Sequence, residues 1–188
     1  MTQIAAIVAH AWCACGPTST SSPNRAAAVF ADRHVRKNIR VDELRIEPVD
    51  ADPTLHDWRH VHNVVIPTAP LSVEDVRERI RRNRLDVGYL GDVVIGCTTV
   101  RPPADDPATA TIIARVLPEH RGRGFGTTLY AHGLARAKEL GVTAVETVVL
   151  ASNEDGLRFA LRRGFTEIER YLLPGDTVPF VTLRRPIG

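Results

Sequence analysis

Apolar and polar positions alternate regularly from about residue 40 to the end of the chain, and they predict its strands and helices. A first strand is expected over 41–49, because Leu44 and Ile46 lie two residues apart and so share a face. Asp52-Pro53 then begins a helix whose apolar residues recur at helical spacing. Pro67 ends that helix, so a loop leads to the next element.

Local signals place the remaining elements. Ser72, with Asp75 three residues later, is typical of a capping box and begins a second helix. Gly91-Asp92 between two apolar runs predicts a hairpin of two strands, 85–90 and 93–100. The near-continuous apolar run 142–150 is typical of a strand that is buried on both faces. The other expected elements are a strand over 108–116, a helix over 125–140, a helix from Asn153 to Arg163, and strands over 165–172 and 178–183.

Length and composition describe one domain over residues 40–188. The chain has 188 residues, of which 44% are hydrophobic and 24% charged, as in ordinary soluble globular proteins. Its net charge is only +2, so composition does not support a nucleic-acid partner. No membrane partner is expected, and the protein is expected to be a monomer or a homodimer. The three cysteines, Cys13, Cys15 and Cys97, make no disulfide framework, which favours a reducing cytoplasm.

Residues 1–39 differ in composition from the rest and are expected to form a flexible arm. The apolar run 4–15 is similar to a signal-peptide core, but no Lys or Arg precedes it and it is too short to span a bilayer. A start codon assigned too early, with Val35 or Val41 as the true beginning, is the alternative explanation of this segment.

Three glycines at alternate positions, Gly122, Gly124 and Gly126, mark the turn after the strand over 108–116. Because glycine has no Cβ atom, the backbone N–H groups of this turn can face outward without steric cost. The turn runs into the helix expected at Phe125, whose N-terminal amides and dipole attract an anion. The sequence therefore predicts a phosphate-binding turn.

Spacing distinguishes between the known kinds of phosphate-binding turn. A Walker loop has a glycine, then four residues, then Gly-Lys-Ser/Thr, and this chain lacks that sequence after Gly122 and Gly124. A dinucleotide fingerprint needs glycine or alanine at the position of Thr127, and it is absent too. The pattern Arg/Gln-x-x-Gly-x-Gly/Ala is present, with Arg121, Gly124 and Gly126 in its defining places.

Flanking residues extend this pattern: Val116-x-Pro118-Glu119 precedes it, and Asn153 and Gly164-Phe165 follow it. The whole resembles the acyl-CoA signature of the GCN5-related N-acetyltransferase (GNAT) superfamily, and the order of elements agrees over about residues 40–184. The resemblance implies an α/β (α+β) fold with a mixed, mostly antiparallel twisted sheet, helices on both faces and a splayed central strand pair. An RNA-binding arginine–glycine segment is the alternative for Arg-Gly-Arg-Gly.

The resemblance also implies how the co-substrate, acetyl-CoA, is bound. In the family the central strand separates from the next one at a bulge, matched here by 114–116, and free strand amides hold pantetheine and polarise the acyl carbonyl. The glycine turn holds the pyrophosphate, and an asparagine closes the groove. Arg162 either lies near the adenosine 3′-phosphate or is an exposed helix charge. The cofactor-binding residues expected are Ala114, Arg115, Val116, Arg121, Gly122, Arg123, Gly124, Phe125, Gly126, Thr127, Asn153 and Arg162.

Two groups that transfer protons in the family are absent from this chain. The usual tyrosine acid is replaced by Ala160, the glutamate base of one branch is replaced by Val148, and Gly156 stands where an alanine is common. Glu146 lies two residues from Val148 on the same strand face, so it is either the catalytic base or a carboxylate paired with an arginine. Tyr171 is the candidate acid, or else a core or surface tyrosine.

The activity implied is transfer of an acetyl group from acetyl-CoA to a primary amine. The acceptor is expected to be a small molecule held by residues 60–71 and the last strands. No metal is expected, because His56 and His60 have metal-compatible spacing but no further ligand. A non-catalytic acyl-CoA-binding or sensing domain is the alternative, motivated by Val148 and Ala160.

Overall fold

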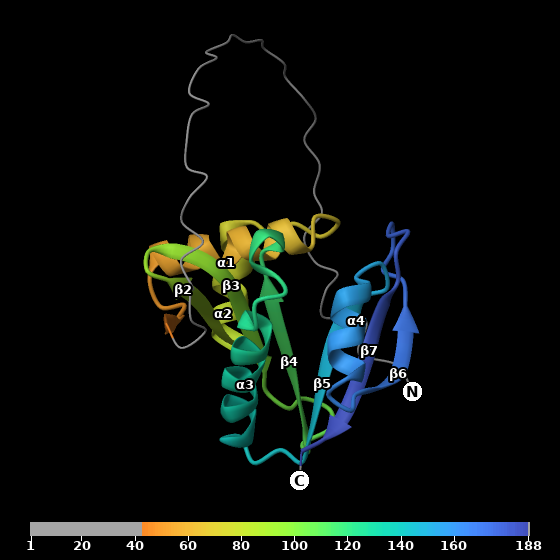
Figure 1. The fold of residues 1–188 in the computed structure, drawn as a ribbon. Helices are drawn as coiled ribbons and strands as arrows, with labels where there is room; N and C mark the ends of the chain where they lie inside the picture. Colours follow the sequence, from red (N-terminus) through yellow and green to blue (C-terminus); the bar gives the residue numbers. More distant parts are fainter. Residues whose placement is uncertain (1–42, 188) are drawn as a thin grey trace. The chain divides into compact units, whose positions relative to one another are not determined.

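The computed structural model describes residues 43–187, so the predicted arm, residues 1–39, lies outside the described residues. The described chain builds one seven-stranded sheet with the order β1-β2-β3-β4-β5-β7-β6 (Figure 1). Only the β4–β5 pair is parallel within this sheet, which confirms the mixed, mostly antiparallel fold. The strands are β1 (Leu44–Pro48), β2 (Arg84–Leu90), β3 (Val93–Arg101), β4 (Thr109–Val116), β5 (Ala144–Leu150), β6 (Thr166–Tyr171) and β7 (Phe180–Pro186).

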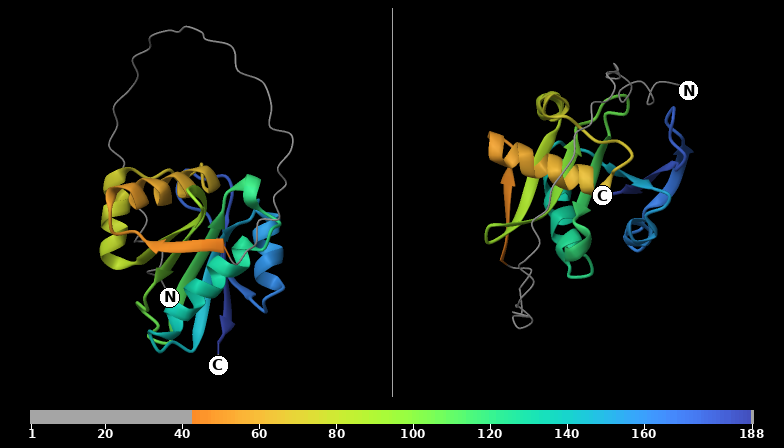
Figure 2. Two further views of the ribbon diagram at one scale, coloured as in Figure 1. Left: turned by 60° about the vertical axis from the view of Figure 1, so that its left-hand side comes forward. Right: turned by 90° about the horizontal axis from the view of Figure 1, so that it is seen from above.

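Helices cover both faces of the sheet (Figures 1 and 2). On one face α1 (Asp52–Val65) packs on β2, β3 and β4 and also contacts α2 (Val73–Arg82). On the other face α3 (Phe125–Lys138) packs on β3 and β4, and α4 (Glu154–Leu161) packs on β5. The prediction of helices on both faces is therefore confirmed.

Two of the helix starts follow from capping side chains. Ser72 Oγ accepts a hydrogen bond from Asp75 N at 3.1 Å, and Ser72 N donates to Asp75 Oδ2 at 2.8 Å, so the predicted capping box is present. Asn153 Oδ1 accepts from Gly156 N at 3.0 Å at the start of α4. Both helices thus begin where the sequence indicates.

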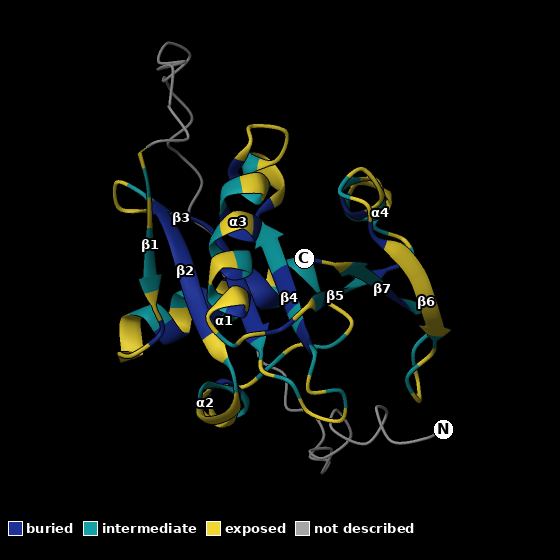
Figure 3. Cartoon of the chain, turned by 90° about the horizontal axis from the view of Figure 1, so that it is seen from below, coloured by how far each residue is buried: buried dark blue, intermediate teal, exposed yellow. Residues whose placement is uncertain are grey.

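Alternate strand residues face the two helical layers. In β3, Cys97 is buried in the cluster that contains Trp58 of α1, whereas Thr98 lies against Gly133 of α3. A Cβ atom at Gly133 would lie only 2.7 Å from Ile112 Cγ2, so the glycine allows α3 to approach β4 closely. Two hydrophobic clusters, one on each side of the sheet, hold most of the buried residues. Figure 3 marks the buried segments, which include most of β2.

The central strands β4 and β5 separate soon after they begin. They pair only from Thr109 with Ala144 to Thr111 with Glu146, and beyond that point Figure 1 shows the strands diverging. We call the separated segments, Ile112–Val116 and Thr147–Leu150, the β4–β5 opening. The predicted splayed pair is confirmed.

Two details of the predicted central strands are wrong. The bulge expected at 114–116 is absent, because β4 keeps an unbroken register with β3 from Thr111 opposite Arg101 to Val116 opposite Gly96. The run 142–150 was expected to be a strand buried on both faces, but residues 147–149 of β5 are only half-buried. The physical reason is the opening itself, which removes the β4 neighbour along this stretch.

The other differences are shifts of element ends. The helix expected to reach Leu140 ends at Lys138, and the one expected to reach Arg163 ends at Leu161. Such shifts are usual at frayed helix ends. Among residues 43–187, no helix combines the length and the hydropathy that crossing a bilayer requires.

Candidate functional site

The glycine turn has the backbone conformation that an anion-binding turn needs. Gly122 and Gly124 adopt φ values of 71° and 89°, which side chains other than glycine rarely tolerate. Gly124 is the N-cap residue of α3, and Thr127 N donates to its carbonyl oxygen at 2.8 Å. The first amides of α3 and its positive dipole end therefore lie at the exposed residues 121–124.

The turn is fastened to β4 by the arginine of the signature. Arg121 Nε donates to the carbonyl oxygen of Val116 at 3.2 Å. The guanidinium itself stays exposed, so its remaining donors are accessible to an anion at the same place. Arg123 packs its guanidinium 5.2 Å from the centre of the buried Phe125 ring.

A second arginine, which was not predicted, reaches the start of α3 from the turn that follows α4. Arg163 Nη2 donates to Thr127 Oγ1 at 2.6 Å, and its guanidinium lies 3.5 Å from the centre of the Phe159 ring. Burial lowers the pKa of Arg163. The predicted Arg162 is instead exposed at the C-cap of α4. Arg162 and Arg163 are adjacent in the sequence and differ only in the direction of their side chains. This direction cannot be inferred from the sequence.

Backbone groups of β4 face the β4–β5 opening. Leu117 N donates to Ile95 O at 3.0 Å, so the odd-numbered residues of this strand pair with β3. Ala114 and Val116 therefore direct their N–H and C=O groups away from β3, toward the side that β5 has left. Of the three strand residues predicted to bind the cofactor, Arg115 differs, because its amide faces β3.

Gly126 lies where the turn, the opening and α4 meet. A Cβ atom placed on it would lie 3.6 Å from Val116 Cγ2 and 3.7 Å from Phe159 Cε2, which are ordinary contact distances. The residue is half-buried, so the space beside it is narrow and accessible. Any side chain larger than alanine would project into it.

The structure explains one departure from the family pattern. A Cβ atom on Gly156 would lie 2.6 Å from Asn153 Nδ2 and 3.0 Å from Val149 Cγ1, so an alanine does not fit without a shift. The Asn153 side chain that caps α4 thus occupies this space. Asn153 lies at the end of the β5–α4 connection, and its role in closing the groove stays a prediction.

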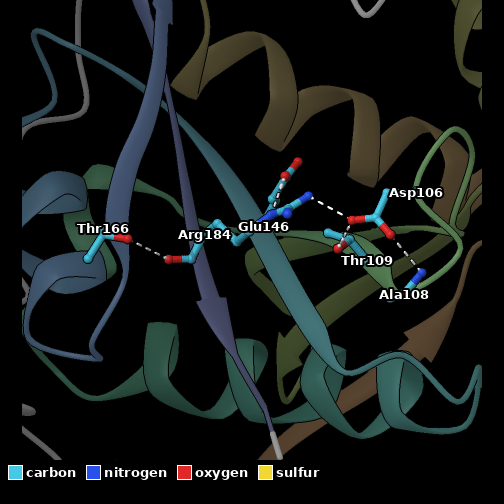
Figure 4. A network of polar contacts seen from close by, with 6 residues as sticks. All are labelled: Asp106, Ala108, Thr109, Glu146, Thr166 and Arg184. Carbon is cyan, nitrogen blue, oxygen red and sulfur yellow. Dashed lines mark hydrogen bonds and ion pairs between the residues drawn. The ribbon is translucent and has the colours of Figure 1, made fainter.

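Glu146 lies in a row of polar residues that crosses five strands on the face covered by α1. The row runs from Arg101 on β3 through Thr111, Glu146 and Arg184 to Thr166 on β6. Arg184 Nε donates to Glu146 Oε1 at 2.9 Å, and its Nη2 donates to Asp106 Oδ2 at 3.0 Å (Figure 4). The carboxylate is thus paired with an arginine at the position where the β4–β5 opening begins.

The Asp106 carboxylate completes this network. It accepts hydrogen bonds from Thr109 Oγ1 at 2.7 Å and from Ala108 N at 3.0 Å (Figure 4). These bonds, with the nearby Arg184 guanidinium as a smaller contribution, lower the pKa of Asp106. Arg184 is therefore shared between two carboxylates.

Tyr171 ends β6 and stacks on Phe180 with ring centres 5.8 Å apart. Burial raises its pKa, whereas the nearby Arg101 guanidinium acts in the opposite direction. Tyr171 pairs with Phe180 and Glu146 pairs with Arg184, four residues apart along β7. At the rise of an extended strand this separation is about 13 Å, so the structure does not bring the two predicted catalytic residues together.

Comparison with known proteins agrees with this geometry. The acetyltransferase (GNAT) family matches residues 51–165, more than half of the chain. A mycothiol acetyltransferase from Propionibacterium freudenreichii is 24% identical over 145 residues, which are 73% of this chain and 46% of that protein. The chain thus spans about half the length of this curated relative.

Solved structures share the fold at low sequence identity. A candidate phosphinothricin N-acetyltransferase is 20% identical, with a TM-score of 0.66 over 77% of this chain and 99% of that chain. A GNAT family acetyltransferase from Elizabethkingia anophelis, solved with acetyl-CoA bound, is 19% identical, with a TM-score of 0.60 over 78% and 99%. The splayed strands, the glycine turn and the family match agree: this chain belongs to the GNAT family of acetyltransferases, whose co-substrate is acetyl-CoA.

Proposed function

We propose that the protein transfers the acetyl group of acetyl-CoA to a primary amine of a small molecule. The observation that carries this proposal is that the backbone of Ala114 and the N–H of Val116 face the side that β5 has left, beside the left-handed glycines of the turn. Strand groups facing an opening suit an extended amide chain such as pantetheine, and the turn suits a pyrophosphate. The residues present therefore fit acetyl-CoA.

The bound thioester supplies an activated acetyl carbonyl. An amine nitrogen forms the new bond to the carbonyl carbon, the carbon–sulfur bond breaks, the amine loses a proton and the thiolate gains one. The chain contributes by positioning both reactants and by directing N–H groups of β4 toward the carbonyl oxygen as negative charge develops there. The amine must be neutral before it attacks, so a proton acceptor or a water path is required.

Glu146 is our candidate for that proton acceptor. Its place at the start of the opening and its exposed fraction of 16% support access from the side that α1 covers. Arg184 Nε donates to its carboxylate at 2.9 Å and holds it at this position. Tyr171 is the candidate proton donor to the thiolate, on the same face at the end of β6.

A non-catalytic acyl-CoA-binding domain is the second candidate. Val148 and Ala160 support it, because apolar residues stand at both family positions for proton transfer. Calorimetric titration with acetyl-CoA, together with CoA thiol release over a panel of amines, distinguishes the two functions. The enzyme predicts binding and release with at least one amine, whereas binding without release on any amine favours the sensor.

The location of the protein is also a proposal. Cys97 is a buried free thiol in the described part of the chain, and acetyl-CoA chemistry suits a reducing compartment. We therefore place the protein in the cytoplasm.

A further inference from the structure

Three arginines and a histidine gather on the face of the sheet that α1 and α2 cover. Arg115 lies on β4 opposite Cys97, and its Cζ is 5.9 Å from the centre of the Trp58 ring. Trp58 in turn stacks on His62, with ring centres 5.4 Å apart. Arg101 ends β3 on the same face, and Arg79 comes from α2.

Part of the Arg115 guanidinium is shielded from solvent without being satisfied. Its Nε and Nη1 atoms are buried and have no hydrogen-bond partner of ordinary geometry among residues 43–187. Its polar neighbour is the thiol of Cys97, whose pKa burial raises to about 11, so the thiol is neutral and a weak acceptor. A buried cationic donor without an acceptor is costly, and in native proteins it usually marks a place for a ligand or water.

These side chains make the region positive. Burial, followed by the charges of Arg101 and Arg115, lowers the pKa of Arg79 to about 10. Burial, followed by the charge of Arg115, lowers the pKa of His62 to about 3, so this imidazole is neutral and its Nε2 donates to Ala69 O at 3.1 Å. Three cations thus share one region of reduced dielectric.

The acidic residues near this cluster are engaged elsewhere. Asp75 accepts the backbone hydrogen bond of the α2 capping box. Glu146 and Asp106 share Arg184, and Asp57 accepts from the Tyr89 hydroxyl at 2.8 Å. No ion pair to Arg79, Arg101 or Arg115 occurs within the described residues.

The cluster lies on the other side of the sheet from the groups suited to CoA phosphates. Val116 and Ile112 face α3 and its N-terminal turn, whereas Arg115, between them in β4, faces α1. Burial, followed by the charge of Arg115, lowers the pKa of Arg101, and Tyr171 acts on it in the opposite direction; Arg115 and Tyr171 lie on strands at opposite sides of the β4–β5 opening. The positive region therefore borders the opening on the face of the sheet that α1 covers.

We propose that Arg115 and Arg101, with Arg79 behind them, bind an anionic group of the acceptor, so that the preferred acceptor is an amine that also carries a carboxylate or a similar oxyanion. This inference rests on the proposed acetyl transfer. The guanidinium of Arg115 donates charge-assisted hydrogen bonds to the anion, and the amine is held toward the opening. The anion supplies the acceptor that the buried Nε and Nη1 atoms lack.

The first test compares paired acceptors that differ only in charge. Release of CoA thiol is measured with L-amino acids and with the corresponding amino acid amides. The wild type is expected to use the carboxylates with kcat/KM about tenfold to a hundredfold higher. Equal use of both series would overturn the anion site and leave the acetyltransferase intact.

Variants assign the preference to the cluster. Arg115→Met and Arg101→Met are expected to remove the preference for carboxylates, Arg115→Lys to keep most of it, and Arg81→Met, at an exposed arginine of α2, to leave it unchanged. Unchanged acetyl-CoA affinity shows that each variant is folded. A further arm of the test replaces acetyl-CoA by succinyl-CoA, with uncharged amines as acceptors. If the wild type prefers succinyl-CoA and Arg115→Met loses this preference, the bound anion belongs to the acyl donor. The assignment to the acceptor would then be wrong.

A binding measurement separates this inference from the proposed function. Trp58 lies beside Arg115, and Trp12→Phe leaves Trp58 as the single tryptophan of the sequence. Succinate, a dicarboxylate without an amine, is titrated into this variant while tryptophan fluorescence is followed. A saturable change that disappears with Arg115→Met supports the anion site even if no amine is acetylated. The absence of a response in the wild type, with acetyl-CoA binding intact, overturns it.

Discussion

A substitution pair at Gly126 tests how the turn and the β4–β5 opening receive acetyl-CoA. An alanine Cβ would lie 3.6 Å from Val116 Cγ2 and 3.7 Å from Phe159 Cε2, so Gly126→Ala fits without a shift. Alanine also favours the helix by about 0.5–1 kcal/mol relative to glycine, so the free energy of unfolding should rise slightly. Acetyl-CoA affinity should remain within a few-fold of the wild type.

Gly126→Val places two further methyl groups in the same narrow space. Overpacking of this kind costs about 1–3 kcal/mol in stability, and the added methyls also block the approach to the α3 amides. Losing one or two charge-assisted hydrogen bonds of about 1.5–3 kcal/mol each lowers affinity by about tenfold to more than a hundredfold. Calorimetric titration with acetyl-CoA measures the loss, and thermal unfolding measures the stability.

Gly133→Ala is the matched control for instability. Its Cβ would lie 2.7 Å from Ile112 Cγ2, away from the turn, so it should lower the melting temperature more than Gly126→Val while acetyl-CoA affinity persists below that temperature. If Gly126→Val bound acetyl-CoA with wild-type affinity, the pyrophosphate would not approach the α3 amides beside Gly126, and this assignment would be refuted.

Three further predictions address the turn, the core and the proton path. Gly124→Val should abolish acetyl-CoA binding, because Gly124 has φ 89° and a β-branched residue cannot hold that conformation; retained binding in calorimetry would contradict it. His62 has a folded pKa of about 3 and an unfolded value near 6.5, so its contribution to stability is complete above pH 6.5 and is lost as the pH falls toward 3. Denaturant unfolding should show stability falling by up to about 1.4 kcal/mol per pH unit there, and His62→Phe should flatten that slope; an identical slope in both proteins would exclude His62 as the cause. Glu146→Gln should remove the acidic limb and Tyr171→Phe the basic limb of the pH–rate profile for thiol release, and wild-type profiles in both variants would exclude these residues.

Most of the fold could be predicted because its helices and turns begin at local sequence signals. The capping residues Ser72 and Asn153 and the Gly91-Asp92 hairpin act within a few residues, so the sequence places those elements closely. The bulge expected at 114–116 is wrong because β4 separates from β5 after Thr111 while its register with β3 stays unbroken.

The site is harder to read from the sequence because its side chains converge from distant elements. The residues of the glycine turn are contiguous in the sequence, but Arg163 contacts Thr127 from the turn after α4, 36 residues further along the chain. Arg115 was expected for its amide, whereas alternation along β4 directs that amide to β3 and the side chain toward Trp58. Such directions depend on tertiary register, which no local pattern contains.

A crystal structure of the chain with acetyl-CoA tests the central claim most directly. The account predicts pantetheine in the β4–β5 opening, paired with backbone groups of Ala114 and Val116, and pyrophosphate on the amides of residues 122–126. Acetyl-CoA bound outside the opening, with β4 and β5 unoccupied between Ile112 and Leu150, would contradict it.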